Sequence, residues 1–304
     1  MKVLVTGGAG FIGSHLVRKL LAEGCEVVVI DNLSTGLRSN LPEGCTFFEM
    51  DINDAALGDF FAGQGFDKVV HLAGQTMVDV SMKEPQIDAA NNIGGTINVL
   101  EAARKNNVQR IIFASTAAAY GDVENLPIKE SMPVNPQSFY GLSKVTVEKY
   151  LAMYWQFYGL EYVILRFANV YGERQGDGGE GGVISIFAKR VAEGKEITIY
   201  GDGEQTRDFI YAGDVASGIW GALNTKELNA IYNLSTQTEV SLKELVGILM
   251  NVAGHKICPV FGPARAGDIY RSMLSNGRAK KYLAWEPVMP LENGLSRTYA
   301  HFCQ

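Results

Sequence analysis

The stretch Lys2-Val3-Leu4-Val5-Thr6-Gly7-Gly8-Ala9-Gly10-Phe11-Ile12-Gly13 decides the fold. Its first five residues are mostly apolar and β-branched, which is typical of a buried parallel strand. The glycines that follow fit both Gly8-x-Gly10-x-x-Gly13 and Gly7-x-x-Gly10-x-x-Gly13. Glycines at these positions permit a tight turn and a close approach of the backbone to a pyrophosphate. We expect a helix over residues 11–23 whose first N–H groups point at the phosphates.

A second apolar strand, Glu26-Val27-Val28-Val29-Ile30-Asp31, ends in a carboxylate at the separation expected for a ribose-binding acid. Such a carboxylate accepts hydrogen bonds from the 2′- and 3′-hydroxyls and repels a 2′-phosphate. The glycines alone would also fit an ordinary strand–helix turn. The order strand, turn, helix and acid instead predicts a dinucleotide site, with NAD rather than NADP as the cofactor.

Composition and charge exclude several classes of protein. The chain has 304 residues and 47% hydrophobic composition, enough for one large α/β domain and a smaller one. A net charge of -6 argues against nucleic acid or an anionic membrane as a partner. We find no leader and no apolar run of membrane-spanning length, so we expect a cytoplasmic protein. Neither the four cysteines nor the four histidines show metal-ligand spacing, so we expect reduced thiols and no metal.

Strand and helix patterns alternate through the first half of the chain, which predicts a doubly wound parallel sheet of the Rossmann type. The further strands expected are 46–50, 68–72, 109–114 and 162–167, and the helices are 54–62, 87–105 and 137–158. Such sheets bind ligands at the carboxyl ends of their strands. We therefore expect Asp51, Ala73 and Gly74 to face the cofactor.

The pattern changes after Tyr171, where a glycine-rich polar connection, residues 175–182, is followed by short elements such as 196–200 and 241–252. We predict a smaller α/β cap over the strand ends that binds the substrate. The predicted cofactor domain is 1–170, with a return segment at about 208–236. The predicted cap is 171–207 together with 237–304.

Catalytic chemistry is indicated by two short motifs. The fifth strand delivers Ser115 and Thr116 to the mouth of the cleft, and Tyr140-x-x-x-Lys144 lies near the start of a helix. Tyrosine and lysine at i and i+4 share one helical face. An ammonium group and a positive nicotinamide ring both favour the phenolate, which would make Tyr140 a usable base. The alternative is that Tyr140 and Lys144 are simply an exposed pair on a helix. Their position after a dinucleotide motif and a hydroxyl-bearing strand argues against this alternative.

With these motifs the chain resembles the extended short-chain dehydrogenase/reductase family, in its sugar-nucleotide branch typified by UDP-glucose 4-epimerase. The resemblance covers essentially the whole length. The matching motifs are residues 7–13, Asp31-Asn32, Asp51-Ile52, His71-Leu72-Ala73-Gly74, Asn91-Asn92-x-Gly94, Ser115-Thr116, Tyr140-x-x-x-Lys144, residues 165–172, residues 201–210 and Pro263-x-Arg265-x-Gly267-Asp268-Ile269.

The resemblance implies a role for each matching residue. Those implied to bind NAD are Gly7, Gly10, Phe11, Ile12, Gly13, Asp31, Asn32, Asp51, Ile52, Leu72, Ala73, Gly74, Gln75, Asn91, Ser115, Tyr140, Lys144 and Phe167. Thr116, Tyr140 and Lys144 are implied to be catalytic, with Thr116 on the sugar 4-hydroxyl. Those implied to bind the nucleotide sugar are Thr116, Asn169, Val183, Ile184, Tyr200, Arg207, Arg265, Asp268 and Ser272. Arginine suits the diphosphate because its forked donors match the oxygens.

The family chemistry implied is epimerisation of a UDP-hexose through a 4-keto sugar with tightly bound NAD. Related 4,6-dehydratases follow the threonine with Asp-Glu, and decarboxylases usually have a glutamate two residues after it. Here Thr116 is followed by Ala117-Ala118-Ala119, which offers no proton carrier for elimination. The same alanines offer no hydroxyl to a uronic acid carboxylate. A 4,6-dehydratase, a uronate epimerase, a net reductase and a non-catalytic NAD-binding scaffold remain as alternatives.

Two finer expectations concern substrate size and assembly. Some epimerases have a bulky tyrosine four residues after the aspartate that Asp268 matches, and here the residue is Ser272. We therefore expect UDP-GlcNAc and UDP-GalNAc to be accepted as well as UDP-glucose and UDP-galactose. Family members commonly pair the helices that match 87–105 and 137–158, so we expect a homodimer.

Overall fold

A seven-stranded sheet is the centre of the fold in the computed structural model, which describes residues 1–176, 181–264 and 269–303. The strands are β1 (Lys2–Thr6), β2 (Glu26–Asp31), β3 (Thr46–Glu49), β4 (Lys68–His71), β5 (Arg110–Thr116), β6 (Glu161–Phe167) and β11 (Ala230–Leu234). Their order is β11-β6-β5-β4-β1-β2-β3, and every neighbouring pair is parallel. The predicted doubly wound sheet is confirmed.

Both faces of the sheet are buried at its inner strands, because side chains there alternate between two apolar cores, whereas the edge strand β3 is mostly exposed. On β1, Val3 and Val5 belong to one core and Leu4 belongs to the other, and all three are fully buried. The continuous apolar runs of the sequence follow from this arrangement, since neither face can carry polar side chains to water.

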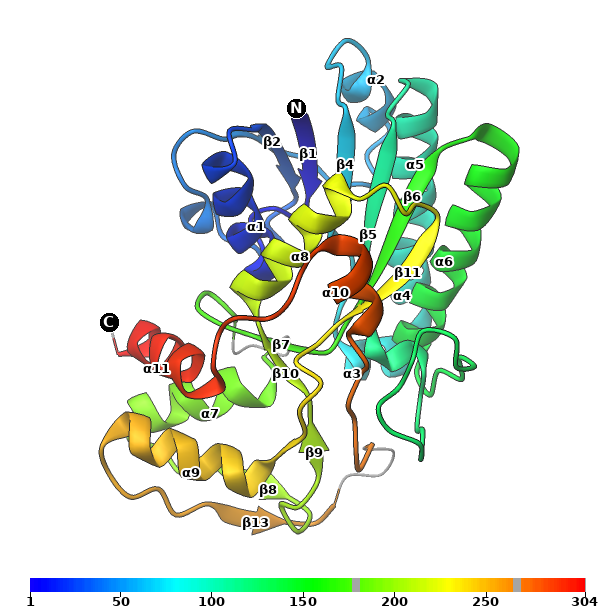
Figure 1. The fold of residues 1–304 in the computed structure, drawn as a ribbon. Helices are drawn as coiled ribbons and strands as arrows, with labels where there is room; N and C mark the ends of the chain where they lie inside the picture. Colours follow the sequence, from blue (N-terminus) through cyan, green and yellow to red (C-terminus); the bar gives the residue numbers. More distant parts are fainter. Residues whose placement is uncertain (177–180, 265–268, 304) are drawn as a thin grey trace.

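Helices cover both faces of the sheet (Figure 1). On one face α1 (Phe11–Ala22) packs against α8 (Ala212–Asn224), and α10 (Gly277–Leu283) packs against α8 and β11. On the other face are α2 (Leu57–Phe61), α5 (Gly95–Lys105) and α6 (Phe139–Tyr158). This second face also carries the short helices α3 (Val78–Lys83) and α4 (Pro85–Ala89), which contact α6.

Two elements differ from the sequence expectation. The helix predicted over 87–105 consists of α4, a π-helical turn at Ala90–Gly94, and α5. The seventh strand, β11, was not predicted, because its run contains the polar residue Asn233. That side chain is fully buried, donates to Ile128 and Ser275 carbonyls and accepts from the Tyr120 hydroxyl. A polar residue satisfied in this way does not show as an apolar pattern in the sequence.

The remaining elements form a smaller unit with its own apolar core, seen below the sheet in Figure 1. It contains α7 (Val183–Ala192), α9 (Leu242–Ala253) and α11 (Leu291–Phe302), which pack on one another. Its two-stranded pairs are β7 (Asn169–Tyr171) with β10 (Phe209–Tyr211), β8 (Thr198–Tyr200) with β13 (Val260–Gly262), and β9 (Thr206–Arg207) with β12 (Val240–Ser241). The domain boundaries named above stay a prediction, and part of the expected glycine-rich connection, 177–180, lies outside the described residues. No described helix is long and apolar enough to cross a membrane.

Candidate active site

The turn between β1 and α1 brings backbone close to backbone. Gly7 has φ +71°, and a Cβ on it would lie 2.7 Å from the Ala73 nitrogen. A Cβ on Gly13 would lie 2.2 Å from the Gly7 oxygen. Gly10 caps α1 without any side-chain hydrogen bond, so the first amides of the helix are left for another acceptor. This arrangement fits an anion such as a pyrophosphate at the helix N-terminus.

Asp31, at the end of β2, is buried and braces the glycine turn. Its carboxylate accepts hydrogen bonds from the Ala9 amide (2.9 Å) and the Leu33 amide (2.9 Å). Burial raises the pKa of Asp31, while these amides oppose the change. Beside it, the Asn32 amide donates to Asp51 Oδ2 (2.7 Å). The carboxyl ends of the first strands are therefore tied together by polar side chains that suit ribose hydroxyls.

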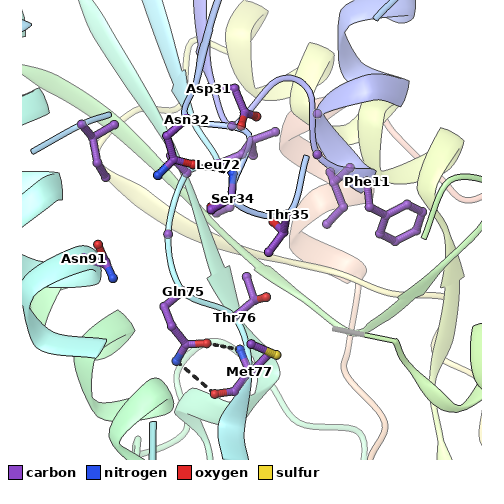
Figure 2. Close-up of a pocket in the computed structure, with 18 of the residues that line it drawn as sticks. Phe11, Asp31, Asn32, Ser34, Thr35, Leu72, Gln75, Thr76, Met77 and Asn91 are labelled. Carbon is purple, nitrogen blue, oxygen red and sulfur yellow. Dashed lines mark hydrogen bonds between the residues drawn. The ribbon is translucent and has the colours of Figure 1, made fainter. Parts of the chain in front are cut away.

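A cavity of about 420 Å³ extends from this turn across the carboxyl ends of the strands. Figure 2 shows Asp31 and Asn32 toward one end and Gln75 and Met77 toward the other. The structure brings every residue expected to bind NAD, together with Thr116, into the lining of this cavity. A long cavity with a glycine turn, a free helix N-terminus and a buried acid fits a dinucleotide in size and chemistry.

A cluster of hydrogen bonds holds the turn after β4 at the other end of the cavity. The Gln75 side-chain amide donates to Asp88 Oδ1 (2.8 Å), and the Gln75 backbone amide donates to Asn92 Oδ1 (2.8 Å). The Asn92 amide in turn donates to Asp88 Oδ1 (3.0 Å) and to Ser143 Oγ (3.1 Å). Because Asp88 and Asn92 are buried, this cluster fixes the turn against the first half of α6.

The three predicted catalytic side chains meet in the cavity. Thr116 ends β5, and its Oγ1 accepts from the Ala118 amide (3.1 Å). Tyr140 lies in the first turn of α6, which Ser138 caps by accepting from the Gly141 amide (3.1 Å). Lys144 follows one turn later, is only 4% exposed, and donates from Nζ to the Ala114 carbonyl (3.1 Å). Its ammonium lies 5.9 Å from the centre of the Tyr140 ring.

Burial shifts both titrating groups away from their charged forms. Burial raises the pKa of Tyr140 to about 12, with the Thr116 hydrogen bond opposing it and the Asp88 charge adding to it. Burial lowers the pKa of Lys144 to about 8, and the Asp88 charge opposes this change. The chain by itself therefore does not produce the easily formed phenolate expected from the sequence. A positive group beside the phenol is still needed.

Among the described residues expected to bind the nucleotide sugar, Thr116 lines this cavity and the others do not. They lie on the smaller unit and the segments beside it: Asn169 on β7, Val183 and Ile184 on α7, Tyr200 on β8, Arg207 on β9, and Ser272. Ile184 is 1% exposed within the smaller core. Arg265 and Asp268 lie outside the described residues.

Several residues of the cavity were missed by the sequence analysis. They are Ser34, Thr35, Thr76, Met77 and Gln175, of which Figure 2 labels the first four. The pairs at 34–35 and 76–77 lie in loops that follow a predicted strand end by a few residues. Proximity to a strand end was a usable signal for them. Gln175 follows β7 by four residues, and no motif distinguishes it. Within the described ranges, no group of three or more His, Cys, Asp or Glu side chains could hold a metal ion.

Comparison with known proteins gives consistent matches over nearly the whole chain. The model of the NAD dependent epimerase/dehydratase family matches residues 3–235. A putative UDP-glucose 4-epimerase of Methanocaldococcus jannaschii is 43% identical, over 97% of this chain and 96% of the relative.

Two solved structures also match over nearly the whole chain. The UDP-glucose 4-epimerase of Thermotoga maritima, determined with UDP-glucose, has a TM-score of 0.96 at 41% identity and covers 99% of this chain and 98% of that one. The UDP-glucose 4-epimerase of Thermus thermophilus, determined with NAD, has a TM-score of 0.93 at 42% identity and covers 99% of each chain.

Proposed function

The chain belongs to the NAD dependent epimerase/dehydratase family, and on that premise we propose that it interconverts UDP-glucose and UDP-galactose through a 4-keto sugar. It is an NAD-dependent epimerase, and therefore an isomerase. The cofactor predicted from Asp31 and the glycine turn is confirmed as NAD. The choice of UDP-hexose, the 4-keto route and the role of each residue are the proposal.

The observation that carries the proposal is the short helical turn after Thr116. It consists of Ala117, Ala118 and Ala119, so only methyl groups follow the hydroxyl that is expected at the sugar. Loss of water from C5 and C6 needs an acid and a base near those carbons. The turn supplies neither, so oxidation at C4 followed by reduction at C4 is favoured over dehydration.

Tyr140 is proposed to take the proton of the sugar 4-hydroxyl and to return it after the keto sugar has turned over. Thr116 positions that hydroxyl by a hydrogen bond. When bound, NAD supplies the acceptor and the donor of the C4 hydride. We propose that Lys144, whose amine is buried at the Ala114 carbonyl and lies 5.9 Å from the centre of the Tyr140 ring, holds a ribose hydroxyl and adds positive charge near the phenol. The raised pKa of Tyr140 in the chain alone suggests that proton removal begins only when the positive cofactor is in place.

The substrate nucleotide is proposed to lie between the cavity and the smaller unit. Arg207 is on β9, and the neighbouring Thr206 amide donates to the Tyr270 carbonyl (2.9 Å). Segment 270–274 is also held by the Ile128 amide, which donates to the Met273 carbonyl (2.9 Å). Ser272 therefore lies on a segment that runs beside the proposed diphosphate arginine, in line with the sequence expectation. Holding the diphosphate while leaving the sugar free would allow the sugar to turn.

The proposal extends to UDP-GlcNAc and UDP-GalNAc, because Ser272 is small where some epimerases have tyrosine. Ser272→Tyr should lower kcat/KM for UDP-GlcNAc about tenfold or more while UDP-glucose turnover changes little. The tyrosine would take the space of the N-acetyl group, and a mismatch of even one methylene group in a pocket changes the binding free energy by about 1–3 kcal/mol. If the ratio of kcat/KM for UDP-GlcNAc to kcat/KM for UDP-glucose is the same in the wild type and the variant, Ser272 does not limit the size of the pocket.

The test of the main proposal is proton NMR of UDP-glucose incubated with purified protein and no added cofactor. Appearance of UDP-galactose, in an equilibrium mixture reached from either side, is expected. A 4-keto-6-deoxy sugar would indicate a dehydratase, and turnover that requires stoichiometric soluble cofactor would indicate a net reductase. No change of either sugar after addition of NAD would contradict the substrate assignment, and a non-catalytic NAD scaffold would then fit better.

We also propose a homodimer, formed through α6 and its neighbours. Apolar side chains stand exposed on this side, including Met153 (52%) and Phe157 (63%) on α6 and Met82 (53%) on α3. Gel filtration with light scattering should give twice the chain mass, and Phe157→Asp should lower it toward a single chain. A monomeric wild type would contradict the proposal.

A further inference from the structure

A buried ion pair lies next to the cavity, outside the groups proposed to react. Glu148 Oε1 accepts hydrogen bonds from Ser115 Oγ (2.6 Å) and Arg166 Nε (2.9 Å), and Glu148 Oε2 accepts from Arg166 Nη2 (2.5 Å). The side chains of Arg166 and Glu148 are 3% and 6% exposed. We call Ser115, Glu148 and Arg166 the buried triad.

Each member of the buried triad lies in the cavity lining or beside it, and Ser115 itself lines the cavity. Ser115 precedes Thr116 at the end of β5, and Arg166 precedes Phe167 at the end of β6. Glu148 lies one helical turn after Lys144 on α6. Ser115 and Arg166 are also direct neighbours in the strand register. The buried triad thus joins β5 and α6, which carry the proposed reacting groups, to the end of β6, which carries Phe167.

Stability alone does not explain this arrangement. The same face of these strands carries apolar residues further back, Ile111 and Phe113 on β5 and Ile164 on β6. Replacing a buried ion pair by apolar residues of similar volume is often neutral or stabilising, because desolvation of the charges offsets their attraction. Arg166 Nη1 makes no hydrogen bond to the described residues, and the guanidinium instead lies over the Tyr120 ring, 4.6 Å from its centre.

The ion pair fixes the relative orientation of the segments that carry it. A forked arginine–carboxylate contact fixes distance and plane, whereas apolar side chains can slide against one another. We propose that Ser115, Glu148 and Arg166 are positioning residues that hold Thr116 and Phe167 in register with Tyr140 and Lys144 for transfer at C4 of the sugar. This inference rests on the proposed epimerase function. A misplacement of about 1 Å at a reacting centre can cost about 100-fold in rate.

The chain contains a matched control at the opposite end of the same two strands. Arg110 begins β5 and Glu161 begins β6, the two residues are register partners, and their side chains form an ion pair of 3.2 Å. Arg110 is 6% exposed. Glu161→Gln therefore removes a carboxylate from a buried arginine on the same strands, far from the cavity.

Three variants, assayed with UDP-glucose as the substrate, test the inference. Glu148→Gln keeps a hydrogen-bond acceptor but leaves Arg166 without its counter-charge. The combination Ser115→Ala, Glu148→Met and Arg166→Met replaces the whole buried triad by apolar groups of similar size. Glu161→Gln is the control. For the first two we expect kcat about 10- to 100-fold lower with KM within about twofold, and for Glu161→Gln a kcat within about twofold of the wild type.

A further readout separates positioning from damage to the fold. With substrate deuterated at C4, the isotope effect on kcat should rise in the first two variants, because poorly aligned hydride transfer becomes the slow step. The melting temperature of the apolar combination should equal or exceed that of Glu161→Gln. A folded apolar combination with wild-type kcat and isotope effect would overturn the inference. If that combination fails to fold, Glu148→Gln is decisive, because neither Glu148 nor Arg166 lines the cavity: it must still lower kcat severalfold and raise the isotope effect, and wild-type values of both would overturn the inference. An inactive wild type would instead contradict the proposed function.

Discussion

Replacing Gly13 by alanine would put a methyl group where the structure has no room for one. The added Cβ would lie 2.2 Å from the Gly7 oxygen and 2.6 Å from the Gly8 Cα, where ordinary contacts begin near 3.4 Å. All of these atoms belong to backbone, so α1 itself must move away from β1 by about 1 Å. Overpacking of this kind costs about 1–3 kcal/mol of stability. It would also carry the first amides of α1 away from the pyrophosphate they are proposed to bind.

The loss of cofactor affinity follows from hydrogen-bond length. An amide moved by about 1 Å from its normal position no longer makes a good bond, and each bond to a charged group is worth about 1.5–3 kcal/mol. We therefore expect NAD to bind about 10- to 100-fold more weakly. The assay is the NAD released per chain on denaturation of purified protein, together with titration of the stripped protein by calorimetry.

Gly247 provides the control for the Gly13 substitution. It lies within α9, and a Cβ there would meet no atom within 4 Å. Gly247→Ala should therefore raise stability by about 0.5–1 kcal/mol through helix propensity alone, with NAD unchanged. Gly13→Ala protein that retains wild-type NAD content and unfolds at the wild-type temperature would refute the reasoning about the turn.

The remaining predictions concern single side chains. Tyr140→Phe should lower kcat about 10²- to 10⁴-fold with NAD still bound, as NMR of the UDP-glucose reaction would show; near wild-type turnover would exclude the phenol as the base. Because the pKa of Lys144 is about 8, kcat should fall as the pH rises through that value, whereas the remaining activity of Lys144→Arg should stay level; the same decline in both would point to another group. Burial raises the pKa of Asp208 to about 6, above about 3.9 in the unfolded chain, so its contribution to stability is complete below about pH 4 and is lost as the pH rises through 6. Urea unfolding between about pH 4 and pH 7 should show this loss, of about 1–3 kcal/mol, in the wild type but not in Asp208→Asn, and parallel curves would contradict it.

The fold could be predicted from the sequence because the inner strands are buried on both faces and therefore consist mostly of apolar residues, as Glu26–Asp31 does. Two residues of the cavity lining were predictable from the same strands, since Asp31 ends β2 and Asp51 follows β3 by two residues. The strand containing Asn233 was not predicted, because that residue is satisfied by contacts with segments far apart in the chain, whereas the loop residues Thr35 and Met77 were missed although they lie close to predicted strand ends. The pKa of Tyr140 was likewise beyond the sequence, because burial, which depends on the whole fold, outweighs the local effect of its neighbours.

A polar group far away in the sequence also changes the pKa values of the titrating groups in the cavity. Asp88 lies on α4, far in sequence from Lys144, yet its charge raises the pKa of both Lys144 and Tyr140. It therefore keeps the amine charged while making the phenol harder to ionise. These two effects oppose each other for a base, because the pKa of Tyr140 stays high beside the Lys144 amine, and the proposed reaction therefore needs the positive ring of bound NAD to lower it. A site arranged in this way would begin proton transfer only with its cofactor in place, which suits a reaction that must return the hydride to the sugar it came from.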